Sequence, residues 1–145
     1  MAYGIYSDIY SLVESRDKTL VRAFLDNFLP NREEAADEYE VPQYSENPSI
    51  VYKNAEELIE YMNNNSNEVH AIYWRSLSDG DPKDAMVFYT SDGCMILGLS
   101  IEDEEKEQYY LRKLMSFTNS DISGIAYEQA PPDTKSEFKE FIKNT

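Results

Sequence analysis

The stretch covering residues 84–101, DAMVFYTSDGCMILGLSI, limits the possible folds more than any other part of this chain. It consists of two apolar runs joined by Ser91-Asp92-Gly93, and an Asp-Gly pair tolerates the left-handed backbone that a tight turn needs. Side chains alternate between the two faces of a strand, and in both runs each face is largely apolar. The sequence therefore predicts a hairpin whose strands lie at the centre of a sheet.

Apolar residues at helical spacing predict four helices around this hairpin. The first has the most regular apolar stripe, with Asp17 as its N-cap, and Pro30 ends it. The others are expected after Asn54, over residues 104–117, and after Thr134, where the pairs Asn54/Glu57 and Thr134/Glu137 form capping boxes. Further strands are predicted at residues 9–13, 68–76 and 122–128.

The length and the cysteine content narrow the fold class. A chain of 145 residues has the usual size of one domain and can bury a core without metal or disulfides. Cys94 is the only cysteine and His70 the only histidine, which excludes an intramolecular disulfide and the usual zinc sites. We expect one α+β domain over residues 1–145, with a mainly antiparallel sheet and about four helices packed on it.

The charge restricts the partners that the chain can bind. Twenty-eight acids against thirteen bases give a formal charge of −15, which repels nucleic-acid phosphates and anionic membranes and attracts a basic protein. The N-terminal residues lack a basic region followed by an apolar run, and no stretch is long enough to span a bilayer. The sequence predicts a cytoplasmic protein that binds neither nucleic acid nor membrane; the oligomeric state is left open.

Residues 31–49, NREEAADEYEVPQYSENPS, form the most distinctive segment, with six acids against one arginine. A loop this long and polar in a compact domain is usually functional or disordered, and its tyrosines favour order. Aromatic residues within a charged rim are typical of a protein interface, although a charge run is more often a solvated face. The predicted partner-binding residues are Glu33, Glu34, Asp37, Glu38, Tyr39, Glu40, Tyr44 and Tyr52.

No catalytic motif accompanies these features. The chain has no Gly-rich phosphate loop, no Gly-x-Ser-x-Gly and no His-Glu-x-x-His. His70 as a general base and Cys94 as a nucleophile are both less expected than packed residues in strands. The acids Asp79, Asp81 and Asp84 lack the glycine position and closing glutamate of a calcium loop. We predict no catalytic residue, no cofactor and no metal, while a carboxylate pair for glycoside hydrolysis is left open.

The small size, the acidity and the segments FLPNREEAADEYEVPQYSENP, IYWRSL and PPDTKSEF resemble bacterial immunity proteins of polymorphic toxin systems. The resemblance implies a cytoplasmic, non-enzymatic inhibitor that binds a toxin domain. It identifies no functional residue in this chain, because these families are too diverse. We therefore expect an acidic protein-binding domain that occludes a basic site on its partner. The alternatives are a small hydrolase that uses carboxylates and a regulatory or structural interaction protein.

Overall fold

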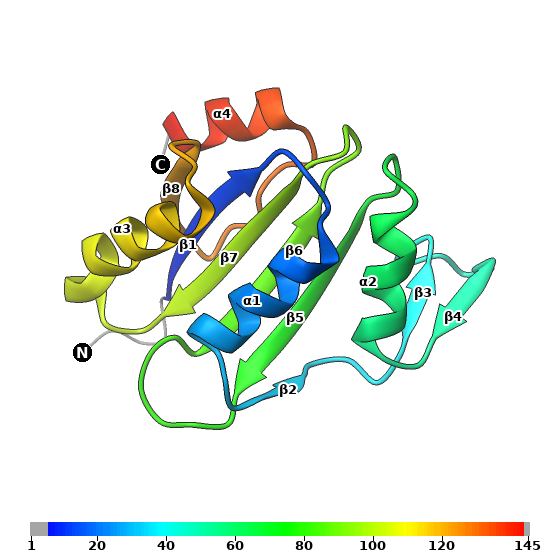
Figure 1. The fold of residues 1–145 in the computed structure, drawn as a ribbon, viewed down its shortest axis with the longest axis horizontal. Helices are drawn as coiled ribbons and strands as arrows, with labels where there is room; N and C mark the ends of the chain where they lie inside the picture. The colour runs from blue at the N-terminus through cyan, green and yellow to red at the C-terminus, as the bar shows by residue number, and fades with distance from the viewer. Residues whose placement is uncertain (1–5, 144–145) are drawn as a thin grey trace.

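The computed structural model describes residues 6–143, which contain a six-stranded antiparallel sheet in the order β2-β5-β6-β7-β1-β8 (Figure 1). Its strands are β1 (Ser7–Val13), β2 (Arg32–Glu34), β5 (His70–Ser76), β6 (Asp84–Tyr89), β7 (Met95–Ile101) and β8 (Ser123–Tyr127). The hairpin formed by β6 and β7 occupies the middle of the sheet, and β5 pairs directly with it. The predicted α+β fold and the central hairpin are confirmed.

Three helices cover the face of the sheet that is turned toward the viewer in Figure 1. These are α1 (Lys18–Phe28), α2 (Ala55–Asn63) and α3 (Glu107–Thr118), the last preceded by the 3-10 turn η1 (Glu104–Lys106). The predicted caps are present, because Asp17 accepts a hydrogen bond from the Thr19 N–H and Asn54 accepts one from the Glu57 N–H. Within residues 6–143 no helix has both the length and the apolar character to cross a bilayer.

The opposite face of the sheet is covered by α4 (Lys135–Lys143) and by the segment that leads to it. Residues 128–134, named here the crossing segment, pass behind β1 and β7 on their way from β8 to α4 (Figure 1). The Tyr10 hydroxyl donates to the Gln129 carbonyl at 2.7 Å, and the Ser91 N–H donates to the Asp133 carbonyl at 2.8 Å. Phe138 of α4 is fully buried against Tyr10. Helices thus lie on both faces of the sheet.

Two glycines fix the geometry of the hairpin. Gly93 has φ 87°, a left-handed conformation that lets the chain turn between β6 and β7, as the sequence predicted. Gly98 lies under the ring of Tyr10, where an added Cβ would come within 2.8 Å of two ring carbons. The absence of a side chain at residue 98 therefore lets the aromatic ring pack directly on the strand.

Arg16, which the sequence did not single out, fastens α2 to the end of β6. Its buried guanidinium donates to the carbonyls of Met62 at 3.2 Å, Asn65 at 2.6 Å and Glu68 at 2.7 Å, and also to the Thr90 carbonyl. These carbonyls belong to the end of α2, to the loop that follows it and to the end of β6. One side chain thus holds in place the helix that follows the acidic segment.

We predict that Leu97→Ala destabilises the protein by about 2–5 kcal/mol, because Leu97 is fully buried in a central strand and truncation leaves a cavity. The free energy of unfolding, measured by urea denaturation, tests this. Leu77→Ala is the control, since Leu77 is exposed and its truncation should change stability by no more than about 0.5 kcal/mol. Equal losses in the two variants would contradict the central position of β7.

Candidate functional site

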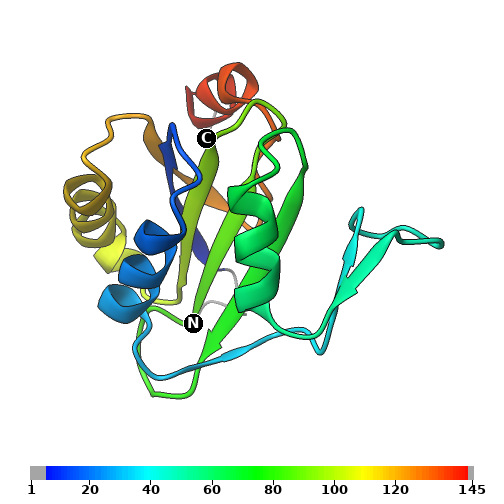
Figure 2. The ribbon, with the colours of Figure 1, turned by 45° about the vertical axis from the view of Figure 1, so that its right-hand side comes forward.

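The acidic segment folds into an arm that projects from the body of the protein. Residues 37–53, named here the arm, contain β3 (Tyr39–Val41) and β4 (Ile50–Tyr52), which pair as a separate two-stranded sheet. Figure 2 shows this sheet standing away from the six-stranded sheet and its helices. The sequence predicted an ordered functional loop here but no strands.

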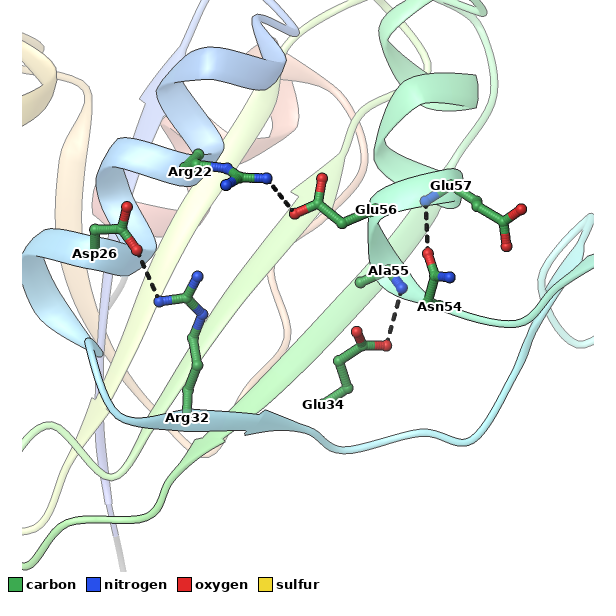
Figure 3. A network of polar contacts seen from close by, with 8 residues as sticks. All are labelled: Arg22, Asp26, Arg32, Glu34, Asn54, Ala55, Glu56 and Glu57. Carbon is green, nitrogen blue, oxygen red and sulfur yellow. Dashed lines mark hydrogen bonds and ion pairs between the residues drawn. The ribbon is translucent and has the colours of Figure 1, made fainter.

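Glu34 ties both ends of the arm to the body. One oxygen of its carboxylate accepts a hydrogen bond from the Tyr39 hydroxyl and another from the Ala55 N–H, each at 2.9 Å. Tyr39 begins β3, and Ala55 begins the helix that follows β4; Figure 3 shows the bond to Ala55. Burial raises the pKa of the Tyr39 phenol, and the Glu34 hydrogen bond and charge raise it further, so the phenol remains a donor. Glu34 is therefore a structural clamp at the root of the arm.

A second attachment lies along β5. The amide side chain of Gln43 accepts from the Ala71 N–H at 2.9 Å and donates to the Ala71 carbonyl at 3.3 Å. Beside it, Nε2 of the buried His70 is 2.8 Å from the Glu40 carbonyl oxygen. The arm is thus held at its root and along one side, and His70 serves as a packed, hydrogen-bonded residue.

Ion pairs surround the root of the arm and neutralise some of the predicted partner-binding acids. Arg22 pairs with Glu56 at 2.8 Å and Arg32 with Asp26 at 3.0 Å, between α1, α2 and β2 (Figure 3). Two further exposed pairs use acids of the predicted site, Glu33 with Arg75 at 3.7 Å and Glu38 with Lys53 at 3.2 Å. Asp37 and Glu46, by contrast, are exposed and have no ion-pair partner among residues 6–143. The Glu40 carboxylate accepts from the Tyr44 N–H at 3.3 Å.

The three predicted tyrosines occupy three different environments. Tyr39 is only 3% exposed and belongs to the main core, so its predicted role as an exposed contact is wrong. Tyr52 is half-buried, with its ring centroid 5.7 Å from that of Tyr61. Tyr44 is 83% exposed. Of these three tyrosines, only Tyr44 therefore has a freely accessible ring.

Tyr44 is exposed and also has an unfavourable backbone conformation. Its φ is 66°, a left-handed conformation that costs a bulky residue roughly 1–2 kcal/mol and a glycine nothing. The backbone conformation at this position therefore favours glycine over tyrosine. Strain of this kind at an exposed position is an indication of function.

Two aliphatic residues add apolar surface to the arm. Ile50 and Val51 of β4 are 37% and 40% exposed, and as neighbours in a strand they point to opposite faces of the arm. β4 has β3 as its only strand partner in this two-stranded sheet. Apolar side chains and an open strand edge on a projecting element are features of a protein-binding surface.

The other candidate groups have structural partners. Cys94 is buried, and its thiol has a raised pKa, chiefly because of that burial. Asp81 accepts hydrogen bonds from the Glu102 and Asp103 N–H groups at 2.8 and 3.0 Å, which organises the loop after β7. The part of the chain that the structure describes contains no cluster of His, Cys, Asp and Glu arranged to hold a metal ion.

Two partly buried carboxylates flank Ser100 on the face of the sheet that α4 covers. Asp84 and Asp8 are the cross-strand neighbours of Ser100 on its two sides, and the Ser100 hydroxyl donates to Asp8 at 2.7 Å. Burial is the main cause of the raised pKa of both carboxyls. Asp8 is almost completely enclosed, while Asp84 is half-buried.

A hollow of about 810 Å³ lies between α1 and α2. Its lining includes Lys18 and Arg22 of α1, which pair with Glu60 and Glu56 of α2. These ion pairs neutralise four of the charged groups of the hollow, while Glu57 accepts a hydrogen bond from the Lys53 N–H at 3.4 Å.

The chain matches no protein family model, no curated protein and no solved structure. The geometry of the arm is therefore the basis for assigning a function.

We predict that Glu34→Ala loosens the arm without unfolding the core. Loss of two hydrogen bonds to a carboxylate should lower the free energy of local opening by about 1–3 kcal/mol. Hydrogen exchange of amides in β3 and β4, compared with amides in β6, measures this. Glu33→Ala is the matched control, because its exposed ion pair with Arg75 is worth less than about 1 kcal/mol. Equal exchange rates in the two variants would refute the clamp.

We predict opposite pH dependences for Asp8→Asn and Asp92→Asn. Burial raises the pKa of Asp8, so the wild type loses stability relative to Asp8→Asn as pH rises from about 4 through the folded pKa. The Thr90 hydroxyl lowers the pKa of Asp92, so the wild type loses stability relative to Asp92→Asn as pH falls below about 4. Urea denaturation over a pH series measures both, and slopes of the same sign would contradict these assignments.

Proposed function

We propose that this protein is a non-enzymatic binding domain that docks its arm on a basic surface of a partner protein. The observation that carries the proposal is Tyr44, a strained and exposed aromatic residue on a projecting element. Aromatic side chains are the residues that most often contribute large binding energies at protein interfaces. The arm is held in place before binding, which reduces the entropy lost when a partner docks.

The distribution of charge supports a basic partner and favours one orientation of approach. Asp37 and Glu46 on the arm have no counterion within residues 6–143. Lys106, Arg112 and Lys113, which also have no ion-pair partner in that range, lie on η1 and α3, on the opposite side of the molecule from the arm (Figure 1). Glu104, Glu105 and Glu107 precede Arg112 and Lys113 on the same elements, so only the later part of α3 is basic. A basic surface is therefore attracted more strongly to the arm than to the later part of α3.

The resemblance to immunity proteins supplies the proposed class of partner. A toxin domain that acts on nucleic acid needs a basic site, and an acidic arm seated over that site excludes its substrate. The proposed setting is the bacterial cytoplasm, where inhibitor and toxin form a stoichiometric complex. Affinity purification from the native host with the wild type and with Tyr44→Gly tests the proposal, because a partner of this kind should be lost in the variant.

We predict that charge and aromatic variants of the arm affect different rate constants. Neutralising Asp37, Glu40 and Glu46 as Asn, Gln and Gln should slow association about tenfold at low salt, and this difference should shrink as salt screens the charges. Tyr44→Gly should raise the dissociation rate at least about tenfold, while stability stays within about 1 kcal/mol of the wild type because the strain is relieved. Surface plasmon resonance against the purified partner measures both rates.

A second triple variant controls for net charge alone. This control removes the same number of negative charges from exposed positions outside the arm, by the substitutions Asp79→Asn, Glu104→Gln and Glu105→Gln. This control should associate faster than the arm variant at low salt. If the two triple variants associate equally, and Tyr44→Gly dissociates like the wild type, the interface lies elsewhere.

A further inference from the structure

The helix on the second face of the sheet leaves part of β5 exposed. α4 packs over β1 and β8, where Phe138 contacts Tyr10 and the side chain of Ile142 adjoins Gly124. On the other side of this face, Tyr73 of β5 is 41% exposed and its ring packs against Phe88 of β6 at 5.7 Å. Apolar side chains of the sheet therefore reach the surface between α4 and the arm.

A groove of about 420 Å³ lies at this place. One side is formed by Ala71 of β5 and by Val69, which directly precedes that strand. Phe88 of β6 and the crossing-segment residues Pro131 and Pro132 form the rest of the apolar lining. Val69 is 36% exposed, and the prolines are half-buried. The groove is thus mainly apolar and large enough for one or two large side chains.

The groove is continuous with the arm. Gln43, which bonds to both backbone groups of Ala71, forms part of its lining. The next residue in the chain is Tyr44, and its phenol lies close enough to Tyr73 to act, after burial, as the second cause of the raised pKa of that residue. A segment of a partner that contacts Tyr44 can therefore continue along Tyr73 into the groove.

The rim of the groove is acidic and lacks counterions. Asp133 and Glu137 line the groove, and neither has an ion-pair partner among residues 6–143. Three cations on the neighbouring elements already have partners, since Lys135 pairs with Glu14, Arg75 with Glu33 and Lys53 with Glu38. Lys139 of α4 forms no ion pair within residues 6–143, and its charge acts on Glu14. A ligand that brings apolar bulk together with positive charge complements both properties of the groove.

We propose that this groove is a peptide-binding site that receives a short basic segment of the protein partner, with one apolar side chain seated between Val69, Phe88 and Pro132. Lys or Arg residues on either side of that side chain meet Asp133 and Glu137. This inference rests on the proposed function and names the part of the partner that the arm brings into place. Arm and groove form one interface, with Tyr44 at their junction.

Selection of a randomised, displayed library of 12-residue peptides on the immobilised wild-type protein tests the site. The enriched peptides should contain a bulky apolar residue flanked by Lys or Arg. As synthetic peptides they should bind Val69→Gln at least about tenfold more weakly than the wild type, while Leu77→Gln, an exposed apolar residue outside the groove, should bind normally. The peptides should also shift the amide resonances of Ala71 and Tyr73 and leave that of Leu77 unchanged.

A charge variant provides a second measurement of peptide binding, and this one does not depend on the packing of apolar side chains. Asp133→Asn with Glu137→Gln should weaken binding of the same peptides by about tenfold, more than Asp79→Asn with Glu104→Gln, which removes as much charge elsewhere. Asn and Gln have nearly the same shape as Asp and Glu and keep a side-chain oxygen that accepts hydrogen bonds. The Thr134/Glu137 cap of α4 is therefore preserved.

Several outcomes would overturn the proposal. These are the enrichment of no peptides, the enrichment of acidic peptides, and equal binding to Val69→Gln and Leu77→Gln. The role of the arm is judged separately, by the effect of Tyr44→Gly on the purified partner protein. A partner that depends on Tyr44 but not on Val69 would leave the proposed function standing and remove the groove from the interface.

Discussion

The need to bury both faces of the central hairpin is the constraint on which the rest of the structure depends. Val87, Leu97 and Leu99 belong to the core under α1, α2 and α3, while Phe88 and Ile96 belong to the core under α4. Neither set can be left in water without losing roughly 1.5–3 kcal/mol for each large side chain. Covering the second face requires the crossing segment, because β8 ends at the edge of the sheet and α4 has to reach Tyr10.

The arm has no such core of its own and depends on the body for its order. An isolated two-stranded sheet is marginally stable in water. Here Tyr39 and Val41 insert their side chains into the main core, and Glu34, Gln43 and His70 supply hydrogen bonds. The result is a projecting element with a fixed root, so that docking of the proposed partner would cost little conformational entropy.

The distribution of charge follows from how few cations the chain has. Eight of the thirteen Lys and Arg residues form ion pairs, and Arg16 is bound to backbone carbonyls. These exposed pairs contribute little to stability individually. Four of them neutralise acids around the root of the arm. The carboxylates that remain without an ion pair among residues 6–143 include those of Asp37 and Glu46 on the arm and of Asp133 and Glu137 along the groove. Burial of the groove by a partner would bring those carboxylates opposite its cations.

The elements whose pattern is local could be predicted from the sequence. Two apolar runs around an Asp-Gly turn identified β6 and β7, helical spacing identified the four helices, and Asp17 and Asn54 marked two of their starts, because each signal depends only on neighbours in the chain. Which residues of the acidic segment are exposed and which are buried follows from contacts between distant parts of the chain. Tyr39 and Tyr44 have the same side chain in the same acidic segment, yet one lies in the core and the other in water. Glu33 and Glu34 are adjacent, yet one forms an exposed ion pair and the other clamps the root of the arm. Burial and hydrogen bonding of these residues depend on Trp74, Ala55 and other residues far away in the sequence, and no local pattern encodes contacts of that kind.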